Sequence, residues 1–376
     1  MNKLKVITVV GTRPELIRLS LIIKLFDNYF EHKLIHTGQN YDYELNEIFF
    51  KDLEIRKPDY FLNVNTSSLG TVIGDTIIKS EKILLQEKPD ALLILGDTNS
   101  SMVAIIAKRL HIPIFHMEAG NRSFDFNVPE EINRRIIDHI SDFNLVYTEH
   151  GRRNLLQEGL PARRIYLTGS PLYEVINHYR KIFEKSDALE RIGVSKFNFF
   201  LVSFHREENV DYKENLNNII ETLETLSLSY NLPVIVSTHP RTRKRMVEYG
   251  IDCKNPLIRF NKPFGFFDYL KLQTNALCTI SDSGTISEES GILGTAAVSI
   301  RNSIERPESL DSGCMILTGL KPDIVLNSLT IVINEWKNKI PEIPVEYTVS
   351  NTSYRVLNIV QGLTSLSNKW DSINSK

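Results

Sequence analysis

The stretch KVITVVGTRPE at residues 5–15 decides the fold of this chain. Its first half, residues 5–10, consists almost entirely of β-branched residues, which favour a β-strand. Gly11 then permits a tight turn, and Pro14 suits the first turn of a helix. A strand that runs through a glycine turn into a helix is typical of α/β proteins, so we expect a parallel sheet covered by helices.

The same alternation continues along the whole chain, which predicts sheets with helices on both faces. The first set of expected strands covers 5–10, 33–36, 91–95, 114–117, 145–148 and 165–168. A second set, after a polar helical stretch around 178–189, covers 199–203, 234–237, 257–260, 277–280, 297–300 and 315–317. Each set predicts one six-stranded open sheet, and the fold class is therefore α/β, with two doubly wound Rossmann-like domains facing a cleft.

We place the first domain at residues 1–171, ending in Gly169-Ser170-Pro171, and the second at 172–352. Residues 353–376 form a closing helix, expected over 354–366, and a polar tail of ten residues; the helix is expected to return to the first domain. The length of 376 residues fits this division, because a domain has roughly 150 residues.

Composition excludes several classes of protein. Apolar residues make up 42% and charged residues 24%, which is ordinary for a globular protein. The formal net charge of −2 gives no support for a nucleic-acid binder or a polybasic membrane-surface protein. The three cysteines form no CxxC pair, which argues against a disulfide framework or structural zinc and favours a reducing cytoplasm. No secretory or membrane-spanning apolar stretch is found.

Ligands of doubly wound folds bind outside the carboxyl ends of the strands, so we look there for chemistry. The turn after the first strand presents helix N–H groups together with the donor fork of Arg13, which suits a phosphate. The alternative is an ordinary turn with a solvated Arg13. The turn matches neither GxGxxG nor a P-loop, which makes a redox enzyme less expected.

Two further strand ends carry carboxylates, Asp97 and Glu118, which neighbouring parallel strands would bring to the same edge. Glu130 opens a later helix behind Pro129. Such acids could transfer protons, hold a divalent metal together with His116, or simply cap helices.

The second half offers anion-binding groups. His205 follows a strand and is either a diphosphate contact or acid/base, or a buried histidine bonded to a carbonyl; His239 presents the same choice. Ser283, Gly284 and Thr285 form a turn that could donate to a diphosphate, with Glu289 accepting ribose hydroxyls, or an ordinary helix start capped by Asp282 or Ser283. Arg306, in a loop with Arg301 and Glu305, would clamp a phosphate or lie in solvent.

Seven motifs appear in order: GTRPE at 11–15, GDT at 96–98, HMEAG at 116–120, PEEINR at 129–134, HREEN at 205–209, SDSG at 281–284 with EE at 288–289, and ERPE at 305–308. Together they resemble the non-hydrolysing UDP-N-acetylglucosamine 2-epimerase family over roughly residues 5–365. This resemblance implies the glycosyltransferase-B arrangement, a UDP-sugar substrate, no metal or nicotinamide cofactor, no nucleic-acid or membrane partner, and a cytoplasmic homodimer.

The resemblance also assigns roles. It implies that a first group of residues holds UDP: Arg13, Arg18, His205, Tyr269, Ser283, Gly284, Thr285, Glu289 and Arg306. His205 is also a candidate catalytic group. Asp97, Glu118 and Glu130 would surround the sugar for proton transfer, and Tyr269 would lie near uracil.

Three departures from the family pattern stand out. Arg18 replaces a common Lys, Thr285 replaces the second Gly of SGG, and the loop TGQN at 37–40 differs from the usual TGQH, which weakens the transfer of allosteric activation. With GNRSFDFNVPEEINRR and IERPESLDSG, they resemble the branch that makes UDP-N-acetyl-L-fucosamine from UDP-2-acetamido-2,6-dideoxy-L-talose for capsule and O-antigen. The alternatives are a UDP-N-acetylglucosamine 2-epimerase, a glycosyltransferase of the same fold, and a UDP-sugar sensor.

Overall fold

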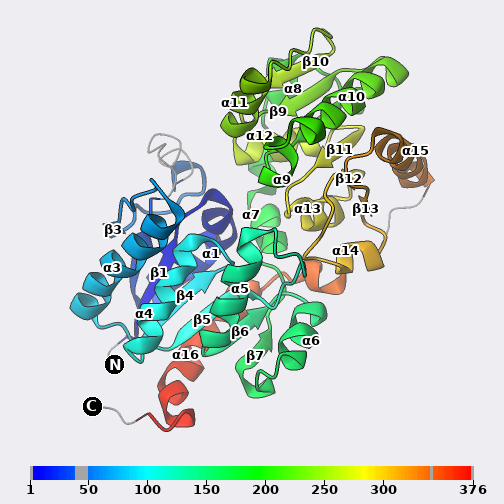
Figure 1. The fold of residues 1–376 in the computed structure, drawn as a ribbon. Helices are drawn as coiled ribbons and strands as arrows, with labels where there is room; N and C mark the ends of the chain where they lie inside the picture. Colours follow the sequence, from blue (N-terminus) through cyan, green and yellow to red (C-terminus); the bar gives the residue numbers. More distant parts are fainter. Residues whose placement is uncertain (1–2, 39–49, 339–341, 374–376) are drawn as a thin grey trace. The chain divides into compact units, whose positions relative to one another are not determined.

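The computed structural model describes residues 3–38, 50–338 and 342–373. The chain divides into two compact units (Figure 1): unit 1 comprises residues 1–176 and 348–376, and unit 2 comprises residues 177–347. The sequence prediction placed the boundaries at 171 and 352 instead. Pro171 lies in the loop before helix α7 (Leu172–Glu184), and the division between the units falls inside this helix, after Ile176.

Unit 1 is built on a parallel sheet. In the described part of the unit, the sheet has seven strands in the order β3-β2-β1-β4-β5-β6-β7. Its strands are β1 (Lys5–Val10), β2 (Glu31–His36), β3 (Tyr60–Phe61), β4 (Ala91–Leu95), β5 (Ile114–Ala119), β6 (Phe143–Val146) and β7 (Ile165–Leu167). The prediction of six strands was wrong because β3 pairs through only two residues at the sheet edge, too few for a periodic pattern.

Unit 2 repeats the design. Within its described residues the sheet has six parallel strands in the order β10-β9-β8-β11-β12-β13, as predicted. They are β8 (Phe200–Ser203), β9 (Val234–Ser237), β10 (Ile258–Asn261), β11 (Cys278–Ser281), β12 (Ala297–Ser299) and β13 (Ile316–Leu317). The doubly wound α/β class is thus confirmed in both units.

Helices cover both sheets (Figure 1). Those of unit 1 are α1 (Arg13–Tyr29), α3 (Leu69–Glu87), α4 (Val103–Arg109), α5 (Pro129–Ile140), α6 (Glu149–Gln157) and α16 (Thr352–Trp370), with 3₁₀ turns η1 (Asn99–Met102) and η2 (Ala162–Arg164). Those of unit 2 are α8 (Ala188–Ile192), α9 (Glu207–Val210), α10 (Lys213–Tyr230), α11 (Pro240–Tyr249), α12 (Phe266–Gln273), α13 (Ile286–Leu293), α14 (Glu308–Asp311) and α15 (Pro322–Asn338). The 3₁₀ turn η3 (Val345–Thr348) precedes the return to unit 1.

The apolar runs that predict the strands form the cores. All five residues of β4 are buried, and the strands of unit 2 contribute buried residues such as Phe200, Val202 and Val236. Burying such side chains stabilises a fold by about 25 cal/mol per Å² of apolar surface. Among the described residues, no helix has the length and apolarity needed to cross a membrane.

The closing helix α16 packs against α1 in unit 1. It is longer than the sequence predicted and takes up the first residues of the expected polar tail. Arg164 accounts for the extension, because its guanidinium donates to Ser367 (3.1 Å) and Asp371 (2.5 Å) and lies 5.1 Å from the Trp370 ring. This cation–π and ion-pair contact holds the last turn of the helix.

Candidate active site

The candidate residues gather where the strand order reverses. In unit 1 the sheet runs outward from β1 in one direction and from β4 in the other, and in unit 2 it does so from β8 and β11. Ligands of doubly wound sheets bind outside the strand ends at such a reversal. The loops and helix starts at the ends of β1 and β4 carry Arg13 and Asp97, the end of β5 carries Glu118, and the loops after β8 and β11 carry His205 and the run Ser283-Gly284-Thr285.

In the turn after β1, Arg13 opens helix α1 and Pro14 lies in its first turn, as predicted. The buried Glu15 carboxylate accepts four hydrogen bonds, from the N–H groups of Gly11 and Thr12 and from the hydroxyls of Thr98 and Ser100. Burial raises the pKa of Glu15 to about 7, although these donors act to lower it. Glu15 therefore ties the turn carrying Arg13, which is half-buried, to the loop after β4.

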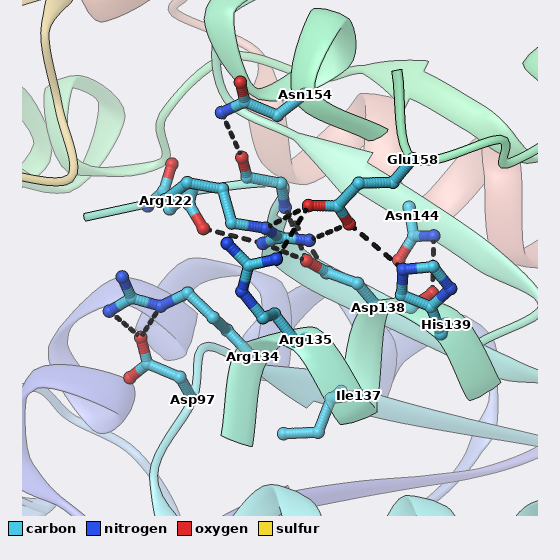
Figure 2. A network of polar contacts seen from close by, with 12 residues as sticks. Asp97, Arg122, Arg134, Arg135, Ile137, Asp138, His139, Asn144, Asn154 and Glu158 are labelled. Carbon is cyan, nitrogen blue, oxygen red and sulfur yellow. Dashed lines mark hydrogen bonds and ion pairs between the residues drawn. The ribbon is translucent and has the colours of Figure 1, made fainter. Parts of the chain in front are cut away.

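Asp97 lies in that loop and is ion-paired. Arg134, on α5, donates from Nη2 (2.6 Å) and Nε (2.9 Å) to the same Asp97 oxygen (Figure 2). Burial raises the pKa of Asp97; Arg134 opposes this, while the charges of Glu118 and Glu130 add to it. A carboxyl with a raised pKa beside other acids is suited to proton transfer. Arg134 was not among the site residues predicted from the sequence.

Glu118, near the end of β5, has an unusual backbone. Its φ is +64°, and the pairing of β5 with β6 shifts register at this point. Non-glycine residues in this conformation cost on the order of 1–3 kcal/mol and concentrate at functional sites. Gly120 follows with φ +80°, and a Cβ there would lie 2.3 Å from the carbonyl oxygen of Gly151. Glu118 lies near the end of β5 and Asp97 lies just after the end of its paired strand β4, so the two acids are at the ends of neighbouring strands, as predicted.

Arg18 lies on α1 next to Glu118. Its Nε is 3.7 Å from Glu118 Oε2, its Nη1 is 3.5 Å from the Ser170 hydroxyl, and its guanidinium lies over the Tyr147 ring. The family resemblance predicted that Arg18 is a UDP ligand. These contacts instead associate it with the carboxylates of unit 1, and a contact with UDP stays a prediction.

Glu130 occupies the first turn of α5, which begins at Pro129 as expected. Its charge reaches Asp97, whose pKa it helps to raise, so the two acids share one electrostatic environment. The neighbouring Glu131 is buried and pairs with Arg134 at 3.0 Å and with Arg135 at 2.9 Å. Glu131 is therefore held in ion pairs within its own helix, while Glu130 is the acid whose charge acts on Asp97.

In unit 2, His205 begins the loop after β8 with its side chain 44% exposed. The alternative of a buried histidine bonded to a carbonyl is therefore wrong. Its Nδ1 lies 3.3 Å from the Asp282 carboxylate, which also accepts from the backbone N–H groups of His205 and Arg206, both at 2.9 Å. Burial acts to raise the pKa of Asp282, but the His205 charge and these donors hold it at about 2.

The turn after β11 contains Ser283, Gly284 and Thr285 and leads into α13. The Ser283 and Thr285 hydroxyls lie 3.0 Å apart, and the N–H of Ser283 donates to Ser281. Thr285 is the N-cap residue of α13 and makes no side-chain cap bond, so the alternative of Asp282 or Ser283 as the N-cap is wrong. Asp282 is turned instead toward the loop after β8.

Two predicted ligands lie on neighbouring helices of unit 2. Tyr269, on α12, shares a 3.0 Å hydrogen bond with Ser203, and burial together with the Glu289 charge raises the pKa of its hydroxyl. Glu289 lies in the first turn of α13 and is buried. Their electrostatic coupling places both beside the turn after β11.

Arg306 is only 4% exposed and forms an ion pair with Glu288, so the alternative of an arginine in solvent is wrong. The nearby Arg301 is buried and bonds Glu305 at 2.6 Å. A Cβ on Gly284 would lie 2.9 Å from Glu305 Oε1, so a larger residue there would displace the end of the Glu305 side chain. Arg301, Glu305, Arg306 and Glu288 thus form ion pairs, and Glu305 lies next to the turn at Gly284.

The described residues contain no group of three His, Cys, Asp or Glu that could hold a metal ion. His116 does not reach out as a metal ligand, because its two ring nitrogens face Asp138 Oδ1 and the Gly96 carbonyl, both at 2.9 Å. Gln39 and Asn40, on which the allosteric question depends, lie outside the described residues.

Comparisons with known proteins agree on one family. The sequence profile described as UDP-N-acetylglucosamine 2-epimerase matches residues 25–361. The solved UDP-N-acetylglucosamine 2-epimerase from Rickettsia bellii is 45% identical, with a TM-score of 0.90, covering 98% of this chain and 99% of its own. The UDP-GlcNAc 2-epimerase from Methanocaldococcus jannaschii, solved with UDP-GlcNAc and UDP, is 35% identical, with a TM-score of 0.89, covering 95% of this chain and 99% of its own.

A further relative has a different substrate in its name. The UDP-2,3-diacetamido-2,3-dideoxy-D-glucuronate 2-epimerase from Pseudomonas aeruginosa is 33% identical, and the alignment covers 86% of this chain and 91% of that protein. The structural likenesses confirm the predicted fold class as glycosyltransferase-B-like.

Proposed function

Because the chain belongs to the UDP-N-acetylglucosamine 2-epimerase family and is thus an isomerase of UDP-sugars, we propose that it inverts C2 of a UDP-2-acetamido sugar. The observation that carries this proposal is the pair Asp97 and Glu118, at the ends of adjacent strands beside the reversal point of the unit 1 sheet. Their shared electrostatic environment, with Glu130 in reach, suits two proton transfers.

The chemistry explains why two acids are needed. The C2 hydrogen is not next to a carbonyl, so its simple removal would leave an unstabilised carbanion. In the proposed route a carboxylate takes the C2 proton while the C1–O bond breaks, which releases UDP and leaves a 2-acetamidoglycal. UDP then adds back to C1, and an acid protonates C2 on the opposite face. Atoms and electrons balance, so the route consumes no oxidant or reductant.

The side chains of unit 1 supply these steps. Asp97 and Glu118 form the proton-transfer pair, and Glu130 assists. Arg134 and Arg18 lie beside the two acids and hold their charged forms in place. General acid–base groups of this kind contribute about 10²–10⁴-fold to rates.

The side chains of unit 2 suit the departing diphosphate. We assign the diphosphate to the turn of Ser283, Gly284 and Thr285 at the start of α13, with Arg306 beneath it. Losing one preorganised donor to a developing anion often costs about 3 kcal/mol. His205 and Arg13 add cationic contacts, while Glu289 and Tyr269 serve the ribose and the uracil.

The first substrate to test is UDP-N-acetylglucosamine, because the relatives with the highest identity among those described carry its name. The incubation contains the purified protein and this UDP-sugar alone, and proton NMR follows formation of UDP-N-acetylmannosamine. We expect a mixture of both epimers. A glycosyltransferase would need an acceptor, and a sensor would bind the sugar without turnover; either result would contradict the proposal.

A second candidate substrate is UDP-2-acetamido-2,6-dideoxy-L-talose, the precursor of UDP-N-acetyl-L-fucosamine in capsule and O-antigen synthesis. The segments GNRSFDFNVPEEINRR (120–135) and IERPESLDSG (304–313) favour it. The Pseudomonas relative supports the idea that family members accept sugars altered beyond C2. Parallel assays of both UDP-sugars decide between them by kcat/KM. A homodimer and a cytoplasmic location stay predictions.

A further inference from the structure

Asp138 is a fully buried carboxylate on α5, and neither the sequence motifs nor the proposed chemistry uses it. It accepts hydrogen bonds from the N–H of Gly120 (3.2 Å) and from Arg122 Nη1 (2.6 Å), and it lies 2.9 Å from Nδ1 of His116. These partners lie on and just after β5, the strand that carries Glu118. Asp138 is thus the point where several parts of the unit 1 edge meet.

One branch from Asp138 leads to Glu118. Gly120 is held on both sides, because its N–H donates to Asp138 while its carbonyl accepts from Asn154 Nδ2 at 2.9 Å (Figure 2). The close approach of Gly151 leaves no room for a side chain at Gly120. The peptide at Gly120 is therefore fixed in place. Because Glu118 connects strand β5 to this fixed peptide, its backbone is kept at a φ of +64°.

The other branch leads to Asp97. His116 Nε2 lies 2.9 Å from the carbonyl oxygen of Gly96, the residue before Asp97. A carbonyl oxygen only accepts, so Nε2 carries a proton and donates it. Asp138 Oδ1 lies 2.9 Å from the other ring nitrogen, Nδ1, an ion-pair contact without the geometry of a hydrogen bond, so the carboxylate attracts the imidazole when both ring nitrogens carry protons.

Helix α5 contacts the surroundings of Asp97 and Glu118 through two side chains, Arg134 and Asp138. Arg134 and Asp138 are four residues apart and so lie on one face of the helix. Figure 2 shows Arg134 directed toward the Asp97 carboxylate and Asp138 directed toward Arg122. Arg134 therefore holds the side chain of Asp97, while Asp138 acts on the backbone beside both acids.

The charge of Asp138 is balanced by Arg122. A buried carboxylate without a partner would be strongly unfavourable, and Arg122 supplies the opposite charge. Arg122 also binds Glu158 with two bonds, at 2.7 and 2.6 Å, and His139 bonds Glu158 at 3.0 Å. Glu158 thus shares Arg122 with Asp138, and none of its hydrogen bonds among the described residues goes to Gly96 or Gly120.

We propose that Asp138 is a positioning residue, which sets the relative placement of Asp97 and Glu118 by anchoring Gly120 directly and Gly96 through His116. This inference rests on the proposed function, in which those two acids transfer protons. A displacement of about 1 Å in a reacting group can cost 10²-fold in rate, so such an anchor matters for kcat.

The test compares Asp138→Asn with Glu158→Gln. Asp138→Asn keeps the size of the side chain but removes its charge, while Arg122 keeps Glu158 as a partner. We expect kcat to fall about 10²-fold with KM within about threefold, and UDP affinity, measured by calorimetry, to stay unchanged. Glu158→Gln weakens the same arginine but leaves both anchors intact, so we expect kcat within about twofold of wild type.

Two variants of His116 isolate the branch to Asp97 and remain informative should Asp138→Asn fail to fold. His116→Asn cannot reach the Gly96 carbonyl and should lower kcat about 10-fold, whereas His116→Gln can place an amide N–H near the Nε2 position and should restore most of the rate. Equal rates for these two variants would contradict the inference. So would an Asp138→Asn enzyme with wild-type kcat, or one in which only KM rises.

A crystal structure of Asp138→Asn separates this inference from the proposed function. We expect Glu118 to leave the positive-φ region or the Asp97–Glu118 distance to change. An unchanged backbone in the variant would overturn the positioning role even if no turnover is detected. A wild-type enzyme that turns over no UDP-sugar would instead overturn the proposed function.

Discussion

The two units share the same strand-to-helix backbone at the edge of the sheet, but they shift the pKa of a carboxylate there in opposite directions. In unit 1, Glu15 lies at the turn after β1 and burial raises its pKa to about 7. In unit 2, Asp282 follows β11 and its pKa is held at about 2 in spite of burial. Both accept two backbone N–H bonds, so the backbone alone does not decide the difference.

The difference comes from the charge of the neighbours. Glu15 receives its other bonds from two neutral hydroxyls, whereas Asp282 faces the His205 ring. An opposite charge favours an ionised carboxylate, while burial with neutral partners favours the protonated form. The comparison teaches that the same strand-to-helix edge carries a carboxylate whose protonated form is favoured by burial in unit 1, and one that a neighbouring charge keeps ionised in unit 2.

The largest expected effect tests the unit 1 side of the comparison. Glu118→Gln removes one of the proposed proton-transfer groups, so kcat should fall about 10³-fold, within the range for general acid–base catalysis. UDP affinity should stay within about threefold, because Glu118 is not among the proposed ligands of UDP. Steady-state kinetics and calorimetry with UDP measure the two quantities.

The matched control is Glu54→Gln, the same change at an exposed glutamate of unit 1 that forms an ion pair with Lys24. It should leave kcat unchanged. Full kcat in Glu118→Gln would remove Glu118 from the proton-transfer pair, and a large loss of UDP affinity would break the division of labour between the units.

The next effect is on stability, with opposite signs in the two units. A group with a raised folded pKa stabilises the fold at low pH and loses that contribution as pH rises through the folded pKa. Because of Glu15, the free energy of unfolding should fall by about 3 kcal/mol as pH rises from 4.5 to about 7, at roughly 1.4 kcal/mol per pKa unit. Asp282 has a lowered pKa, so it contributes about 2 kcal/mol above pH 4 that is lost as pH falls toward about 2.

Urea unfolding of Glu15→Gln and Asp282→Asn across this pH range measures both contributions as differences from wild type. Glu15→Gln should gain stability relative to wild type as pH rises from 5 to 7. Asp282→Asn should be less stable than wild type at pH 7, and the gap should narrow on acidification. Differences of the same sign in both variants would show that the two edges are electrostatically alike.

A smaller effect tests the unit 2 side. Ser283→Ala removes a hydroxyl from the proposed diphosphate turn and should weaken UDP binding about 10-fold, or about 1.4 kcal/mol. Ser195→Ala, at an exposed position of the same unit, is the control and should bind UDP as wild type does. Equal UDP affinity in Ser283→Ala would move the diphosphate away from this turn.

The smallest effect concerns Arg18, where the family commonly has Lys. Arg18→Lys keeps a positive charge near Glu118 but loses the planar contact with Tyr147 and the reach to Ser170. We expect kcat within about threefold of wild type, because the charge is the shared feature. A loss of more than about 30-fold, measured by steady-state kinetics, would show that the guanidinium geometry itself is used.

The sequence predicts the fold well because buried parallel strands are continuous apolar runs. The apolar runs at Lys5–Val10 and Ala91–Leu95 favour strands clearly, and both form strands as expected. The strand Tyr60–Phe61 was not predicted, because two residues at a sheet edge form no periodic pattern. The end of α16 was not predicted, because its polar residues are bound by Arg164, which is about 200 residues away in sequence.

The candidate site is predicted in part, for a related reason. Motifs at strand ends locate Asp97 and Glu118, because the topology alone brings neighbouring parallel strand ends together. The contacts of Arg134 and Asp138 depend on how α5 rotates against the sheet, which a single sequence does not reveal. The spacing of four residues between them on one helix face was the available signal.

The most direct test of the proposed chemistry is the turnover of a UDP-2-acetamido sugar in D₂O, starting with UDP-N-acetylglucosamine, with the product examined by NMR. Elimination and re-addition with two acids on opposite faces of C2 predicts one solvent-derived deuterium at C2 of every product molecule. Epimerised product that carries no deuterium at C2 would contradict this mechanism.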